Sequence, residues 1–269
     1  MTAQTKLSNK NKEKKFVCVG LDTDIEILPK HILKLENPVL EFNKQIIENT
    51  AEYAAAYKLN FAFYEKDGDK GMQNLFQTVK LIPKDILIIA DAKRGDIGNT
   101  AKMYAKEIFD FFNFDSVTLN PYMGKDSLDP FLSYHDKLNF ILTLTSNQGA
   151  LDFEKLKCED GSFLFQKVID KVSSWNLVKN CGLVFGATQL EDLKENLDRT
   201  DQMPLLIPGV GAQGGSFKDI VELLKTKPDK NYIVNVSRGI IYKSKEVDFA
   251  VAAKSEIIKY NKTFSEVLF

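Results

Sequence analysis

Short apolar runs alternate with amphipathic segments along almost the whole chain. The runs fit strands, at residues 16–21, 55–59, 86–90, 116–119, 140–144, 182–185, 205–207 and 232–236. Helical periodicity marks segments between them, such as 39–53, 97–112, 163–175 and 217–225, with a closing helix around 247–260. Eight strands, each followed by a helix, within about 250 residues are typical of a (β/α)8 TIM barrel. The pattern therefore predicts this α/β fold, and a doubly wound open sheet is the alternative.

The chain is expected to form one catalytic domain, because no Ser/Pro-rich linker or composition shift divides its 269 residues. Residues 16–269 would be the barrel. Residues 1–15 carry lysines but lack the apolar core of a signal peptide, so we expect a flexible, polar, solvated tail there.

Composition and cysteine spacing argue against several kinds of protein. Lys plus Arg (36) nearly balances Asp plus Glu (37), so no overall field attracts nucleic acid or an anionic membrane. No run reaches the ~20 apolar residues of a membrane span. The three cysteines show no C-x-x-C spacing, and the two histidines, His31 and His135, are far apart. These features disfavour a disulfide framework, a metal site and a Ser-His-Asp triad, and they fit a reducing cytoplasm.

The charged stretch from Asp91 to Thr100 follows directly on the apolar run 86–90. Because side chains alternate along a strand, Asp91 and Lys93 should point to the same side. Asp96 and Thr100 are four residues apart where the next helix should begin, which would place them on one helix face. The stretch predicts a lysine between two carboxylates at the mouth of the barrel, although D-x-K-x-x-D taken alone is more typical of a solvated turn.

A glycine-rich segment, residues 209–216, follows the seventh predicted strand and leads into a helix. Its backbone N–H groups suit a phosphate, and the loops after strands seven and eight are where phosphate-binding barrels hold that anion. Arg238, at the end of the last strand, offers a permanent charge for the same group. A glycine-rich loop alone is more often a plain turn, but its pairing with Arg238 favours a phosphate site.

Other polar side chains follow the remaining strands. Ser146 and Gln213 are uncharged hydrogen-bonding groups that suit the edge of a neutral heterocycle, and Asp22 and Lys58 suit sugar hydroxyls. Alternatives stay open for both pairs. Ser146 or Gln213 could instead form hydrogen bonds with the backbone of a loop, and Asp22 or Lys58 could form a structural ion pair.

The motifs lie at successive strand ends, at residues 19–24, 57–60 with 62–65, 91–100, 120–122, 145–147, 208–215 and 237–239. In this order they resemble the orotidine 5′-phosphate decarboxylase family, in particular its longer bacterial branch. The resemblance implies a cytoplasmic homodimer with shared active sites. It also implies conversion of orotidine 5′-phosphate to uridine 5′-phosphate and carbon dioxide, the last step of de novo pyrimidine nucleotide synthesis, without metal or organic cofactor.

The resemblance further implies a role for each matching position. Lys93 would protonate C6 of the pyrimidine, with Asp91 beside the departing carboxylate, and Asp96 and Thr100 would serve the neighbouring subunit's site. The remaining substrate contacts would come from Asp22 and Lys58 (ribose), Ser146 (pyrimidine), Gln213 (base and phosphate), Arg238 (phosphate), and Pro208, Gly214 and Ser237 around the phosphate. Gln148 departs from the proline that many relatives have at its position.

Two other functions remain open at this stage. A magnesium-dependent sugar-phosphate decarboxylase or aldolase of the same superfamily also carries D-x-K-x-x-D, and Glu65 is the one spare acidic residue for its metal. A catalytically silent barrel that binds a nucleotide is the second alternative.

Overall fold

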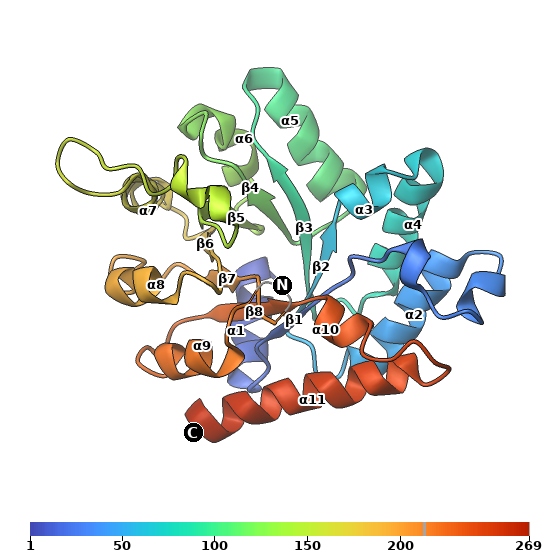
Figure 1. Cartoon of the computed structure of the whole chain (residues 1–269). Coiled ribbons are helices and arrows are strands. Elements are labelled where there is room, and N and C mark those ends of the chain that lie inside the picture. Colours follow the sequence, from blue (N-terminus) through green and yellow to red (C-terminus); the bar gives the residue numbers. More distant parts are fainter. Residues whose placement is uncertain (212–213, 269) are drawn as a thin grey trace.

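The strands form a closed parallel barrel in the computed structural model, which describes residues 1–211 and 214–268. They pair in chain order from β1 to β8, and β8 closes the ring on β1 (Figure 1). The strands are β1 Val17–Gly20, β2 Ala56–Asn60, β3 Leu87–Arg94, β4 Ser116–Leu119, β5 Leu138–Leu144, β6 Cys181–Phe185, β7 Leu205–Ile207 and β8 Tyr232–Val236. The predicted barrel is confirmed, and the open sheet is excluded.

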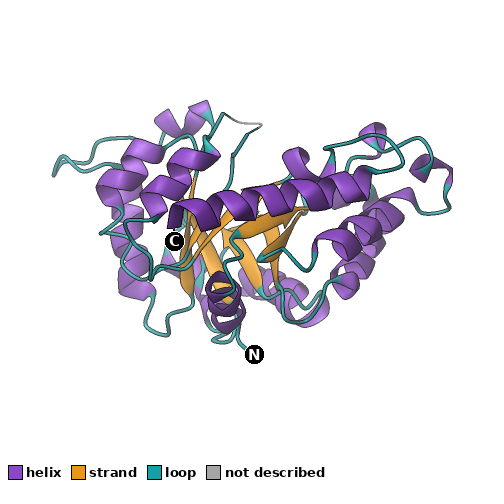
Figure 2. Cartoon of the chain, turned by 90° about the horizontal axis from the view of Figure 1, so that it is seen from below, coloured by secondary structure: helices purple, strands orange, loops and turns teal. Residues whose placement is uncertain are grey.

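Helices surround the barrel, and Figure 2 shows the long α11 lying across the strands. The longer helices are α2 Pro38–Thr50, α4 Gly68–Leu81, α5 Gly98–Lys106, α7 Leu164–Trp175, α8 Leu190–Asn196, α9 Phe217–Leu224 and α11 Phe249–Leu268. Short helices are α3 Ala62–Glu65, α6 Asp129–Leu132 and α10 Arg238–Ile241. Within the described residues, none of the helices has the length and apolar character needed to cross a membrane.

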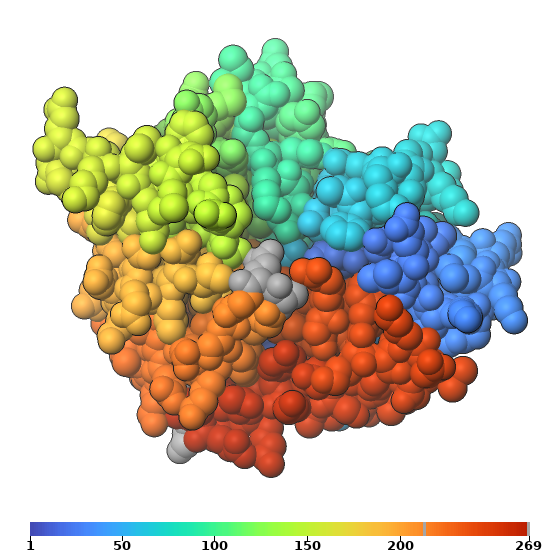
Figure 3. All heavy atoms as spheres, viewed as in Figure 1, coloured from blue at the N-terminus to red at the C-terminus, as the bar shows by residue number. Residues whose placement is uncertain are grey.

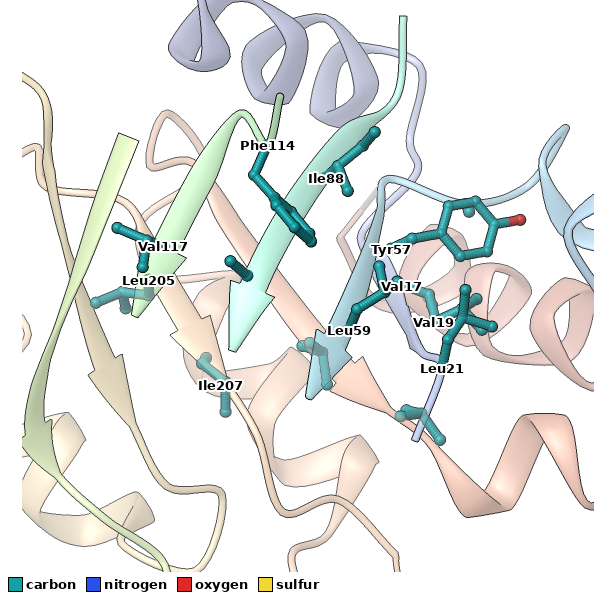
Figure 4. Packing of buried hydrophobic residues seen from close by; sticks show 14 of the residues in the cluster. Val17, Val19, Leu21, Tyr57, Leu59, Ile88, Phe114, Val117, Leu205 and Ile207 are labelled. Carbon is teal, nitrogen blue, oxygen red and sulfur yellow. The ribbon is translucent and has the colours of Figure 1, made fainter. Parts of the chain in front are cut away.

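The hydrophobic core has two layers, because side chains alternate along each strand. Val17 and Val19 belong to the outer layer, which packs against the helices, and Figure 4 shows them among neighbours from other strands. Cys18, between them, belongs to the inner layer. That layer is tightly filled, since a Cβ on Gly182 would lie 2.7 Å from the ring of Phe140. The barrel interior is therefore a packed core rather than a pore.

The amino-terminal residues differ from the predicted solvated tail, because they form helix α1, Ala3–Lys12. Ala3 and Leu7 are buried and join the inner layer of the core. Lys6 pairs with Asp115 at 2.7 Å, and other α1 contacts also reach residues that precede strands. The helix thus closes the amino-terminal end of the barrel, below the strands in Figure 2. The sequence did not indicate this burial because two of the four buried α1 residues are lysines, Lys6 and Lys10, so the helix has no continuous apolar face.

Candidate active site

A cavity of about 310 Å³ opens at the carboxyl ends of the strands. Figure 3 shows segments following one another around the molecule in chain order, so residues far apart in the sequence meet at this end. The cavity is lined by eight of the predicted site residues, namely Asp22, Lys58, Asp91, Lys93, Ser146, Pro208, Ser237 and Arg238. The prediction that strand-end polar groups share one mouth is therefore confirmed for these residues.

The centre of the cavity is a carboxylate held by two lysines. Lys58 Nζ donates to Oδ2 of Asp91 at 2.7 Å, and Lys93 Nζ donates to Oδ1 at 2.6 Å. Asp22 lies 3.7 Å from Lys58. We predicted a lysine between two carboxylates of one stretch, whereas within this chain Asp91 lies between two lysines. The second lysine, Lys58, comes from the neighbouring strand β2, so the motif on β3 could not by itself predict this contact.

Burial and charge oppose one another at this centre. Burial by itself would lower the pKa of Lys58, but Asp22 and Asp91 outweigh it and raise that pKa above its ordinary value. Burial would likewise raise the pKa of Asp91, but Lys58 and Lys93 bring it well below its usual range. Both groups are therefore charged at neutral pH, and they form a buried ion pair at the centre of the site.

The loop after β5 brings Ser146 to the cavity and is braced from two sides. Thr145 donates through its backbone N–H to Glu154 Oε2 at 2.6 Å. Gly186 permits close approach on the other side, because a Cβ there would lie 2.5 Å from the backbone nitrogen of Ser146. Gly186 thus lets the loop approach closely, and the Glu154 carboxylate holds it there.

The glycine-rich loop after β7 uses backbone conformations that favour glycine. Gly209 has φ +96° and Gly214 has φ +93°. Pro208 and Gly209 line the cavity, but Gly214 does not, and predicted Gln213 lies outside the described residues. Arg238, at the start of α10, lines the cavity on the β8 side and has an exposed side chain.

Ser237 has a structural contact as well as its place in the cavity. Its hydroxyl donates to the carbonyl of Gly20 at 3.0 Å, across the junction between β8 and β1. A Cβ on Gly20 would lie 2.7 Å from the Cβ of Ser237, so this close approach requires glycine.

Asp96 and Thr100 do not line the cavity of their own chain. The carboxylate of Asp96 accepts the backbone N–H of Ile97 at 2.7 Å, and Thr100 is exposed. We predicted that both lie on one helix face, but α5 begins at Gly98, so Asp96 precedes the helix. The prediction of a shared helix face is therefore wrong.

Two buried polar residues of the cavity were missed by the sequence analysis. Thr118 of β4 and Asn235 of β8 both line the cavity and are nearly buried, at 2% and 7% exposure. Oδ1 of Asn235 has no hydrogen-bond partner among the described residues. Each has a polar side chain at an inward position of a strand, and the alternation along these strands was the available signal.

The described residues hold no group of three or more His, Cys, Asp or Glu side chains arranged to bind a metal ion. Glu65, the spare acidic residue noted from the sequence, pairs instead with Arg94 at 2.9 Å and does not line the cavity. The residues present therefore do not fit a metal site built on Glu65.

Comparison with known proteins agrees with this geometry. A curated Orotidine 5′-phosphate decarboxylase of Dehalococcoides mccartyi is 47% identical over 246 residues, covering 90% of this chain and 89% of that protein. One from Flavobacterium johnsoniae is 43% identical over 272 residues, covering 100% and 98%. The solved Leishmania donovani OMP decarboxylase is 35% identical with a TM-score of 0.83, covering 98% and 100%.

The sequence model of one family matches residues 15–253. This span begins just before β1 and ends within α11, so it takes in every strand of the barrel and the residues that line its cavity. By this match and these relatives, the chain belongs to the Orotidine 5′-phosphate decarboxylase / HUMPS family.

Proposed function

We propose that this protein decarboxylates orotidine 5′-phosphate to uridine 5′-phosphate and carbon dioxide, without a metal or organic cofactor. The observation that carries the proposal is the charge centre, in which Asp91 binds Lys93 at 2.6 Å and Lys58 at 2.7 Å inside the barrel mouth. The named relatives support the same reaction. The near balance of charge in the chain supports a small-molecule substrate rather than nucleic acid.

Lys93 supplies the proton in this mechanism. The bond between C6 and the carboxylate breaks, carbon dioxide leaves, and the electron pair stays on C6, where the ring delocalises it poorly. The Lys93 ammonium stabilises this developing negative charge and then transfers its proton to C6. Asp91 orients that ammonium through its 2.6 Å contact, and the neutral amine regains a proton from water.

The remaining cavity residues bind the parts of the substrate that do not react. Asp22 and Lys58 contact the ribose, and Ser146 contacts the pyrimidine. Arg238 binds the phosphate together with the loop that contains Pro208, Gln213 and Gly214, beside Ser237. Enzymes typically accelerate reactions by up to ~10¹⁷-fold, which corresponds to lowering the activation free energy by about 23 kcal/mol. One lysine cannot supply that much. Binding energy from the phosphate therefore contributes, by favouring the conformation in which the site is assembled.

The protein is a cytoplasmic homodimer with shared active sites in this proposal. Asp96 and Thr100 act across the interface, which explains why neither lines the cavity of its own chain. Exposed apolar side chains beside them support an interface, namely Ile97, Met103, Tyr122 and Met123, which are 54%, 54%, 78% and 47% exposed. The three free cysteines support a reducing compartment.

One assay separates this function from its rivals. Purified protein is mixed with orotidine 5′-phosphate in excess EDTA, and loss of the substrate carboxylate is followed by ultraviolet absorbance. We expect turnover that EDTA does not reduce. Activity that disappears with EDTA and returns with Mg²⁺ would contradict the metal-free mechanism, and Mg²⁺-dependent turnover of a sugar phosphate without any turnover of orotidine 5′-phosphate would favour the metal-dependent class. Binding of uridine 5′-phosphate without any turnover would favour a silent nucleotide-binding barrel.

A further inference from the structure

The pairing of β3 with β4 is interrupted where β3 carries its charged residues. Ala90 pairs with Val117 and Arg94 pairs with Leu119, so Asp91, Ala92 and Lys93 lie opposite a single residue, Thr118. Such a bulge disrupts the regular hydrogen bonding of a sheet and redirects the side chains that it contains. A second element must then hold the bulged residues in place.

Thr118 makes two hydrogen bonds to this bulge. Its hydroxyl donates to Oδ1 of Asp91 at 3.1 Å, and the same oxygen accepts the backbone N–H of Lys93 at 3.0 Å. The hydroxyl thus replaces the missing pairing between the strands. It contacts the side chain of one proposed catalytic residue and the backbone of the other.

The backbone of Lys93 has an unusual conformation. Its φ is +48°, in the left-handed region that residues with a Cβ rarely adopt. Lys93 is the one residue other than glycine that combines a positive φ with a place in the cavity, within the described residues. Strain of this kind persists when surrounding contacts fix it, and the Thr118 hydrogen bond to the Lys93 N–H is such a contact.

We propose that Thr118 is a positioning residue that fixes the Lys93 backbone and the Asp91 carboxylate in their productive arrangement. This inference rests on the proposed decarboxylation, because Lys93 is there the proton donor. Thr118 is 2% exposed, so water competes little with its hydroxyl for these two partners. Its loss leaves the Lys93 N–H unpaired and Asp91 Oδ1 with one donor fewer, and Lys93 Nζ moves away from C6.

The test compares Thr118→Val, which keeps the volume but removes the hydroxyl, with Thr118→Ser, which keeps the hydroxyl. The matched control is Thr143→Val on β5, where Thr143 is also 2% exposed but its hydroxyl donates only to the nearby carbonyl of Ile141. We expect kcat to fall about 100-fold in Thr118→Val, as for a misplacement of about 1 Å, with KM within about threefold of wild type. Thr118→Ser should recover most of kcat, and Thr143→Val should leave it unchanged.

Wild-type kcat in Thr118→Val would overturn the inference, as would equal losses in Thr118→Val and Thr143→Val or no recovery in Thr118→Ser. A crystal structure of Thr118→Val tests the positioning without using activity. We expect the Lys93 φ to leave the left-handed region and the contact from Lys93 Nζ to Asp91 to break. Persistence of both would refute the inference even if the wild-type protein is inactive, whereas an inactive wild type with the expected shift would refute only the decarboxylation.

Discussion

Lys58 Nζ lies 2.7 Å from Oδ2 of Asp91 in a contact that is almost completely buried. The two side chains are 5% and 10% exposed. Lys93 binds the other oxygen of the same carboxylate at a similar distance, but its side chain is 49% exposed. One anion therefore takes part in a buried ion pair and a solvated one, and the two lysines should contribute differently to stability.

Replacing either lysine by methionine should reveal this difference. Lys58→Met leaves the buried carboxylates of Asp91 and Asp22 with less compensating charge, and we expect the free energy of unfolding to fall by about 3–5 kcal/mol. Lys93→Met removes a solvent-screened pair and should cost less than about 1 kcal/mol. Urea unfolding of the three proteins measures both values. Equal losses would mean that burial does not separate the two contacts.

The stability of the protein should depend on Asp91 in acid. Burial raises the pKa of Asp91, but Lys58 and Lys93 together lower it below its value of about 3.9 in an unfolded chain. A carboxylate with a lowered folded pKa stabilises the fold above that unfolded value, and the contribution is lost as pH falls through the folded pKa. Unfolding free energies measured from about pH 6 to about pH 2 should thus fall more steeply for wild type than for Asp91→Asn. Parallel curves would contradict this.

Helix α1 should contribute to stability through Leu7, which is fully buried against the inner core layer. Leu7→Ala should lower the free energy of unfolding by about 2–5 kcal/mol, because it removes buried methyl groups and leaves a cavity. Leu177→Ala is the matched control, since Leu177 is 85% exposed, and it should change stability by less than about 0.5 kcal/mol. Equal stability of the two variants would show that α1 does not close the barrel in solution.

The sequence predicted strands well where apolar residues fill them and less well where they do not. The strands at 116–119, 205–207 and 232–236 have the predicted bounds. The strand predicted to end at Ala90 continues through polar residues to Arg94. No propensity indicates that extension, because it depends on pairing with β2 and on the bulge against β4.

The site was predictable to the extent that a barrel brings strand ends together. Lys93 Nζ and the Asp91 carboxylate are in contact, as expected for side chains on the same side, although the strand is bulged there and does not alternate regularly. The role of Lys58 as a second ligand of Asp91 depends on the register of β2 against β3, which pairs Asn60 with Asp91. Thr118 was missed for a related reason, because its importance comes from a bulge that the sequence does not reveal.

Arg238 should govern recognition of the phosphate and little else. We expect Arg238→Ala to weaken binding of uridine 5′-phosphate by about 2–5 kcal/mol, while binding of uridine stays nearly unchanged. Arg199→Ala is the matched control, because Arg199 pairs with Asp170 and does not line the cavity. Calorimetric titration of both ligands measures the difference. Equal losses for uridine and its phosphate would place Arg238 elsewhere in the mechanism.

Asp96 lies only three residues beyond Lys93, yet it is not part of the cavity that Lys93 lines. Within the part of the chain that the structure describes, its carboxylate accepts a hydrogen bond from the neighbouring backbone N–H of Ile97, and it does not cap α5. This placement leaves its carboxylate available to a neighbouring subunit. A two-fold interface uses the same patch on both chains, so Asp96 would then complete the partner's site while the partner completes its own.

Mixing two inactive variants should therefore restore activity. Under the proposed mechanism, Lys93→Ala lacks the proton donor, and Asp96→Ala lacks the group given across the interface. In a mixed dimer one site carries both defects and the other carries neither, so a fully exchanged equimolar mixture should recover roughly a quarter of wild-type activity, with half of the dimers mixed and one intact site in each. Native mass spectrometry verifies subunit exchange, and each variant mixed with itself is the control. If Asp96 serves only its own chain, every site keeps one defect and exchanged mixtures stay inactive.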